Sequence, residues 1–182
     1  MDKNHATFEN FQLLEENLTP SSSSLLFYEN AFSKIKLIQE IISKQNKSIL
    51  YVDFDLLFSG YMKSQLLKFP NLTLFNTAEE DLGKILPKIL TKISTEPHLV
   101  IFDSMNGLYN ILSNDADSGR VVNSILMLLA QNSQFSKSVL IIFALAGKKD
   151  KSWTLPNGRQ ILENENIKKF FISDRSKITI EI

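Results

Sequence analysis

Acidic side chains end or follow several apolar runs in this sequence. Asp53 and Asp55 follow SILYV, Asp103 follows HLVIF, and Glu29 follows SLLFY. If the runs are parallel strands of one open sheet, their carboxyl ends share an edge, which is where such sheets bind ligands. We therefore expect a ligand site built from residues 29–35, 53–60, 103–107 and 146–159.

A second group of chemically capable residues lies in the polar segment GKKDKSWTLPNGRQ. Its cations Lys148, Lys149, Lys151 and Arg159 surround Trp153, the only tryptophan of the chain. An aromatic ring among cations is the combination that stacks a nucleic-acid base and neutralises phosphates. The segment is predicted to form an exposed loop or hairpin that binds nucleic acid. The alternative is a solvated loop with Trp153 packed on the body of the protein.

The elements that must position these residues are readable from hydrophobicity. Continuous apolar runs, unlike alternating ones, are typical of strands covered on both faces. Five such runs predict strands at residues 24–28, 48–53, 72–75, 98–103 and 138–145. Further strands at 161–162, 169–173 and 177–182 are expected to give the sheet an antiparallel C-terminal edge.

Amphipathic patterns predict helices between these strands. Residues 31–44 and 78–94 each place isoleucines or leucines on one face, and Pro87 is expected to kink or delay the second helix. A third helix is predicted after Asp117, a suitable N-cap. Alternating strands and helices predict an α/β fold, a mostly parallel central sheet flanked by helices. Residues 1–23 are expected to be a helix and linker, and 24–182 the α/β domain.

Composition narrows the classes of function. The 182 residues carry 20 basic and 20 acidic side chains, so no overall charge attracts nucleic acid or an anionic membrane. The chain has no cysteine and two histidines, which excludes disulfides, thiolate chemistry and a histidine-rich metal centre. Its start lacks the features of a secretory signal and no long apolar segment occurs, so a cytoplasmic protein without a membrane partner is expected.

In the order and residue composition of their apolar and polar segments, residues 24–182 resemble the RecA and KaiC superfamily of P-loop ATPases. HLVIFDSMNGL is similar to the second nucleotide motif of that family, which implies that Asp103 holds Mg²⁺ through water. YVDFD is similar to the strand whose acidic residue orients the attacking water, which implies that Asp55 is the catalytic carboxylate. The resemblance implies a RecA-like fold.

The phosphate loop departs from the pattern of the family. A working loop needs glycines whose amides wrap the phosphates, then a lysine and a Ser or Thr hydroxyl for Mg²⁺. The equivalent stretch runs from Tyr28 to Ile35, and within it Lys34 alone matches. Tyr28 and Ser33 replace glycines, and Ile35 offers no oxygen to a metal. The nucleotide site, formed by Ser33, Lys34, Asp103 and Ser104, is therefore interpreted as vestigial.

These features predict a non-hydrolysing, pseudo-ATPase module that forms a homo-oligomer or joins related RecA-like subunits. It resembles a subunit of the Elongator accessory ring or a KaiC-like paralogue, which implies binding of RNA, tRNA or DNA through the basic loop. No catalytic residue, metal or cofactor is expected. One alternative is a weakly active protein that binds ATP and Mg²⁺ through Lys34, Asp55 and Asp103. The other is a pure protein-interaction domain.

Overall fold

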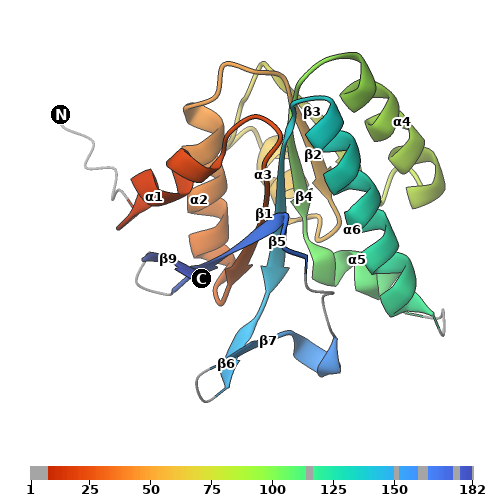
Figure 1. The fold of residues 1–182 in the computed structure, drawn as a ribbon. Helices are drawn as coiled ribbons and strands as arrows, with labels where there is room; N and C mark the ends of the chain where they lie inside the picture. The colour runs from red at the N-terminus through yellow and green to blue at the C-terminus, as the bar shows by residue number, and fades with distance from the viewer. Residues whose placement is uncertain (1–7, 114–116, 150–151, 160–163, 174–176, 182) are drawn as a thin grey trace.

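A computed structural model describes residues 8–113, 117–149, 152–159, 164–173 and 177–181. Its central sheet has the strand order β3-β2-β4-β5-β1-β8-β9 (Figure 1). Neighbouring strands from β3 to β8 are parallel, and β9 is antiparallel to β8. The predicted α/β class is confirmed. The strands are β1 (Ser23–Tyr28), β2 (Ile49–Asp53), β3 (Leu72–Asn76), β4 (Leu99–Asp103), β5 (Val139–Leu145), β8 (Ile167–Ile172) and β9 (Ile178–Glu181).

Helices cover both faces of the sheet, as Figure 1 shows. One face packs against α1, α2 and α3, and the other against α4, α5 and α6. This double cover explains why the central strands read as continuous apolar runs. The helices are α1 (Phe11–Asn17), α2 (Ala31–Ser43), α3 (Leu57–Lys63), α4 (Leu82–Thr95), α5 (Met105–Ile111) and α6 (Ser118–Phe135).

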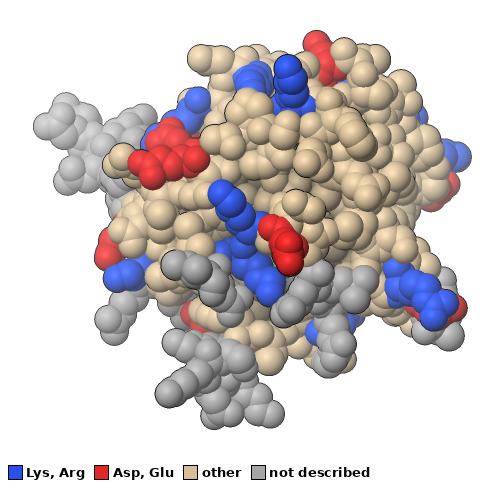
Figure 2. Space-filling view, viewed as in Figure 1, with Lys and Arg blue, Asp and Glu red and all other residues tan. Residues whose placement is uncertain are grey.

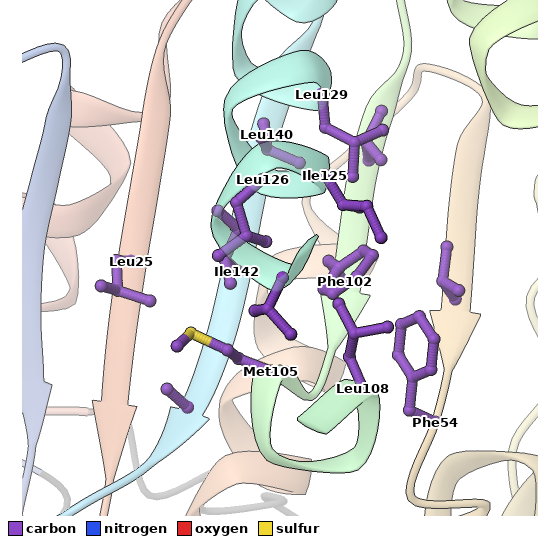
Figure 3. Packing of buried hydrophobic residues seen from close by; sticks show 14 of the residues in the cluster. Leu25, Phe54, Phe102, Met105, Leu108, Ile125, Leu126, Leu129, Leu140 and Ile142 are labelled. Atoms are coloured by element: carbon purple, nitrogen blue, oxygen red, sulfur yellow. The ribbon is translucent and has the colours of Figure 1, made fainter. Parts of the chain in front are cut away.

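Two hydrophobic clusters, one on each face, hold the helices to the sheet. In the cluster shown in Figure 3, Leu126 and Leu129 of α6 lie over the strands that carry Leu140, Ile142 and Phe102. Each fully buried side chain of this size contributes about 1.5–3 kcal/mol relative to an exposed one. The sheet is therefore a firm platform for the residues at its carboxyl edge.

Some predicted boundaries are wrong for local reasons. Helix α4 begins at Leu82 rather than residue 78, because the Asn76 side chain accepts a hydrogen bond from the Ala78 amide and shapes a turn there. Asp81 then caps the helix at the Lys84 amide. Pro87 lies inside α4, so it does not delay the start of the helix.

The C-terminal third contains a hairpin and the edge of the sheet. Strands β6 (Gly147–Lys149) and β7 (Ser152–Thr154) pair antiparallel, which confirms the predicted loop or hairpin, and a short 3₁₀ turn (Pro156–Gly158) follows. The predicted antiparallel edge is β9 on β8, while β8 itself runs parallel to β1. The strand predicted at residues 161–162 lies outside the described residues. Within the described chain, no helix has the length and apolar character needed to span a membrane.

Candidate functional site

The connection between β1 and α2 consists of Glu29 and Asn30 alone. Asn30 is the N-cap of α2, and its side-chain oxygen accepts hydrogen bonds from the amides of Phe32 (2.7 Å) and Ser33 (3.4 Å). Free amides at a helix N-terminus are what a phosphate group binds. Here a side chain of the protein itself occupies two of them, and no glycine lies in the connection.

Lys34 points from α2 to the carboxyl edge of the sheet and is 1% exposed. Its Nζ lies 2.6 Å from Oδ1 of Asp103 and 3.3 Å from Oδ2 of Asp55. It also lies over the ring of Tyr28, 4.9 Å from the centroid. The structure thus brings Lys34, Asp55 and Asp103 together, as the sequence predicts, but as direct ion pairs.

Asp103 ends β4 and is fully buried. Its second oxygen, Oδ2, accepts a 2.5 Å hydrogen bond from the hydroxyl of Tyr51 on β2. Both carboxylate oxygens of Asp103 are therefore engaged by groups of the same chain. Tyr51 was missed in the sequence, although it stands two residues before Asp53 on a strand and so faces the same side of the sheet.

Burial and charge set the protonation of this cluster. Burial alone would lower the pKa of Lys34, but the charge and hydrogen bond of Asp103, together with Tyr28 and Asp55, outweigh it and raise that pKa above its ordinary value. Burial raises the pKa of Asp103 to about 6, although Lys34 and Tyr51 act to lower it. Burial also raises the pKa of Tyr28 to about 12. Burial likewise raises the pKa of Tyr51. At neutral pH, Lys34 is therefore charged, and Tyr28 and Tyr51 are neutral hydrogen-bonding groups.

Asp55 follows β2, and its side chain is 27% exposed. Gly107 of α5 approaches it so closely that a Cβ at this position would lie 2.6 Å from Oδ1 of Asp55 and 2.5 Å from Cβ of Phe54. Ser104 caps α5 by accepting a hydrogen bond from the Gly107 amide (3.3 Å). Gly107 lies within the predicted range 103–107, but its close approach to Phe54 and Asp55 depends on contact with a loop distant in sequence and was not predicted.

Of the predicted nucleotide residues, Lys34 and Asp103 form the ion pair, whereas the two serines lie beside it. Ser104 caps a helix and Ser33 is buried at the start of α2, so each has a structural role beside the ion pairs. Asp53 is buried and accepts a 2.6 Å hydrogen bond from the Ser59 amide at the start of α3. Within the described chain, no three acidic or histidine side chains are grouped to hold a metal.

The residues present do not fit Mg²⁺ and a nucleotide triphosphate. Asn30 covers amides that would meet phosphate, Lys34 is already neutralised, and Ile35 offers no metal ligand. Glu29 adds an acidic residue to the connection between β1 and α2, and Asp55 is paired with Lys34.

The basic loop is partly engaged with the rest of the chain. The Trp153 ring stacks on Phe171 with centroids 4.8 Å apart. Arg159 donates hydrogen bonds to the Asn106 carbonyl and the Asn110 side chain, and lies over the ring of Tyr109. Lys151 lies outside the described residues, as do the side chains of Lys148 and Lys149 in β6. Nucleic-acid binding by this loop stays a prediction.

Comparison with known proteins supports the fold. No protein-family model matches the chain, and neither does any curated protein. A crystal structure of the RadB recombinase matches with a TM-score of 0.61 over 88% of this chain and 79% of that chain, at 15% sequence identity. At this identity the match shows the fold alone, and the fold is RecA-like.

Proposed function

We propose that this chain is a RecA-like module that does not hydrolyse ATP and acts as a subunit of a larger assembly. One observation carries the proposal: Lys34, the one residue that matches the family's phosphate loop, is buried in ion pairs with Asp103 and Asp55. The cation that would stabilise phosphate is used to hold the sheet edge together.

The energetics disfavour a switch to nucleotide binding. Removing one partner from a buried ion pair costs about 3–5 kcal/mol, because the other charge is left buried and unpaired. A phosphate that drew Lys34 away would leave the fully buried Asp103 with the Tyr51 hydroxyl alone. Phosphoryl transfer depends on positioning and charge stabilisation, and this site supplies neither.

Several exposed apolar side chains support the assembly part of the proposal. Single exposed apolar side chains are common on protein surfaces, whereas Leu128 and Phe135 share one face of α6 and offer a partner a joint apolar contact. The large apolar side chains that are at least one third exposed are Phe32, Leu56, Leu66, Ile111, Leu128, Phe135 and Leu145.

Isothermal titration calorimetry with Mg-ATP tests the proposal. We expect no saturable binding up to millimolar nucleotide. Two variants locate any signal that does occur: Lys34→Met removes the buried cation, and Lys36→Met removes an exposed one on the same helix. Saturable binding that Lys34→Met abolishes and Lys36→Met retains would overturn the proposal in favour of the ATP-binding alternative.

A further inference from the structure

Helix α6 carries an exposed seam, defined here as Val121, Ser124, Leu128, Gln131 and Phe135. The steps between these residues alternate between three and four, which is the spacing by which one helix packs along another in a coiled coil. Phe135 is 87% exposed and Leu128 39% exposed, while Ser124 and Gln131 are also exposed. These four residues face solvent, whereas Val121 at the start of the seam is half-buried and packs against the cluster that holds α6 to the sheet.

This face of α6 is uncharged. Residues 121–135 contain no Asp, Glu, Lys or Arg, although 22% of the chain is charged. The neighbouring α4 shows the usual pattern, with Lys84, Lys88 and Lys92 exposed. Figure 2, drawn in the orientation of Figure 1, shows a broad surface without charge over α6. A solvent-facing helix ordinarily carries charged or polar residues there.

We propose that the seam of α6 packs antiparallel against the same seam of a second copy of this chain. A neutral face gives a charged partner nothing to pair with, but it is complementary to itself. In the antiparallel arrangement, large Phe135 meets the partner's small Ser124, and Leu128 meets the aliphatic part of the partner's Gln131. A parallel arrangement would place Phe135 on Phe135 and leave a gap between the two serines.

The contact is small, so the dimer should be weak. An 18-residue helix is about 27 Å long and about 10 Å wide with its side chains. Each copy would bury on the order of 500 Å², near the lower limit for a specific interface. The inference deepens the assembly part of the proposed function and rests on it, whereas the nucleotide part is independent.

Sedimentation equilibrium of the full chain at micromolar to millimolar concentrations tests the inference. Leu128→Glu and Phe135→Glu place charge in the seam at exposed positions, where circular dichroism should show an intact fold. Leu66→Glu makes the same change at a residue that is 70% exposed in the segment after α3. We expect a monomer–dimer equilibrium that the seam variants weaken at least tenfold and Leu66→Glu leaves unchanged. A monomer throughout, or self-association that the seam variants leave unchanged, would overturn the inference.

Cysteine cross-linking tests the orientation, because the chain has no cysteine of its own. In the antiparallel pair, the two copies of residue 131 lie about 5 Å apart along the axis and the two copies of residue 124 about 16 Å apart. Gln131→Cys should therefore cross-link to itself under oxidation, whereas Ser124→Cys should not. Equal cross-linking of both variants would contradict the antiparallel arrangement. Neither result changes the calorimetry with Mg-ATP, so failure of the seam and failure of the nucleotide proposal are distinguishable.

Discussion

At the scale of single residues, the Lys34–Asp103 pair joins α2 to the carboxyl end of β4 at the edge of the sheet. Asp103 has no contact with water and depends on Lys34 and Tyr51 for its hydrogen bonds. A buried charge pair is stable when its remaining lone pairs are satisfied in this way. The pair thus has a structural role in the protein, and its effect on stability can be measured.

The pH dependence of stability should report on Asp103. Its pKa is about 6 in the folded chain against 3.8 for the ordinary carboxyl group, so the folded state binds the proton more tightly. Protonation of this group therefore stabilises the fold as pH falls from about 7 to below 4. Asp103→Asn lacks this contribution. In urea unfolding, the stability of the parent relative to Asp103→Asn should rise as pH falls.

The other carboxylates act in both proteins and largely cancel in that difference, so Asp103→Asn is its own control for general acid effects. A parent advantage that shrinks toward acid pH would mean that Lys34 and Tyr51 outweigh burial and hold the pKa of Asp103 below its ordinary value.

Substitution of Gly107 should be costly although it lies in a helix. An added Cβ would meet Cβ and the backbone of Phe54 at 2.5 and 3.0 Å, and neither can move without shifting the loop that carries Asp55. Overpacking of this kind costs about 1–3 kcal/mol, which exceeds the gain in helix propensity of about 1 kcal/mol. We expect Gly107→Ala to lower the free energy of unfolding.

Gly60 of α3 provides the matched control, since a Cβ there would have no atom within 4 Å. Gly60→Ala should be neutral or stabilising by up to about 1 kcal/mol. Equal effects of the two substitutions would show that the approach of α5 to Asp55 is not tight in solution.

At the scale of elements, the basic hairpin is open to a direct test. The sequence predicts that Lys148 and Lys149 contact phosphates and that Trp153 stacks on a base. Single-stranded RNA or DNA should then quench the emission of Trp153, the sole tryptophan. Affinity should fall with salt, with a log–log slope that declines by about 0.7 for each lysine replaced by glutamine. Base stacking would have to use a part of the Trp153 ring that Phe171 does not cover.

Lys36→Gln is the control, because this exposed lysine lies on α2, away from the hairpin. Unchanged emission at saturating RNA and DNA, together with hairpin variants that behave like Lys36→Gln, would assign the hairpin a structural role.

The buried strands and the longer helices could be predicted from the sequence, and the short helices α3 and α5 could not. The buried strands show continuous apolar runs and the helices α2 and α6 show amphipathic periodicity, and both patterns can be recognised without knowledge of neighbouring elements. The helices α3 and α5 have seven residues each, which is too few for a pattern. The turn at Asn76 depends on a side chain bonding to the backbone, and residues 77–80 look helical until that bond is known.

The candidate site was also predicted only in part. Lys34, Asp55 and Asp103 could be predicted because each stands near a strand end and matches a position in the family pattern. The contacts of Tyr51 with Asp103 and of Gly107 with Phe54 and Asp55 could not, because these partners lie far away in the sequence and the order of strands in the sheet decides whether they meet. That Lys34 forms direct ion pairs also depends on how closely α2 packs, which no local pattern records.

At the scale of the whole molecule, the central position of β1 has a consequence for the growing chain. Ser23 of β1 pairs with Leu140 on one side and with Ile167 on the other. During synthesis from the N-terminus, β1 is therefore made before both of its neighbours in the sheet, β5 and β8. Until they emerge from the ribosome, both edges of β1, whose sequence SSLLFY is largely apolar, lack their partners, a condition that favours aggregation and recruits chaperones.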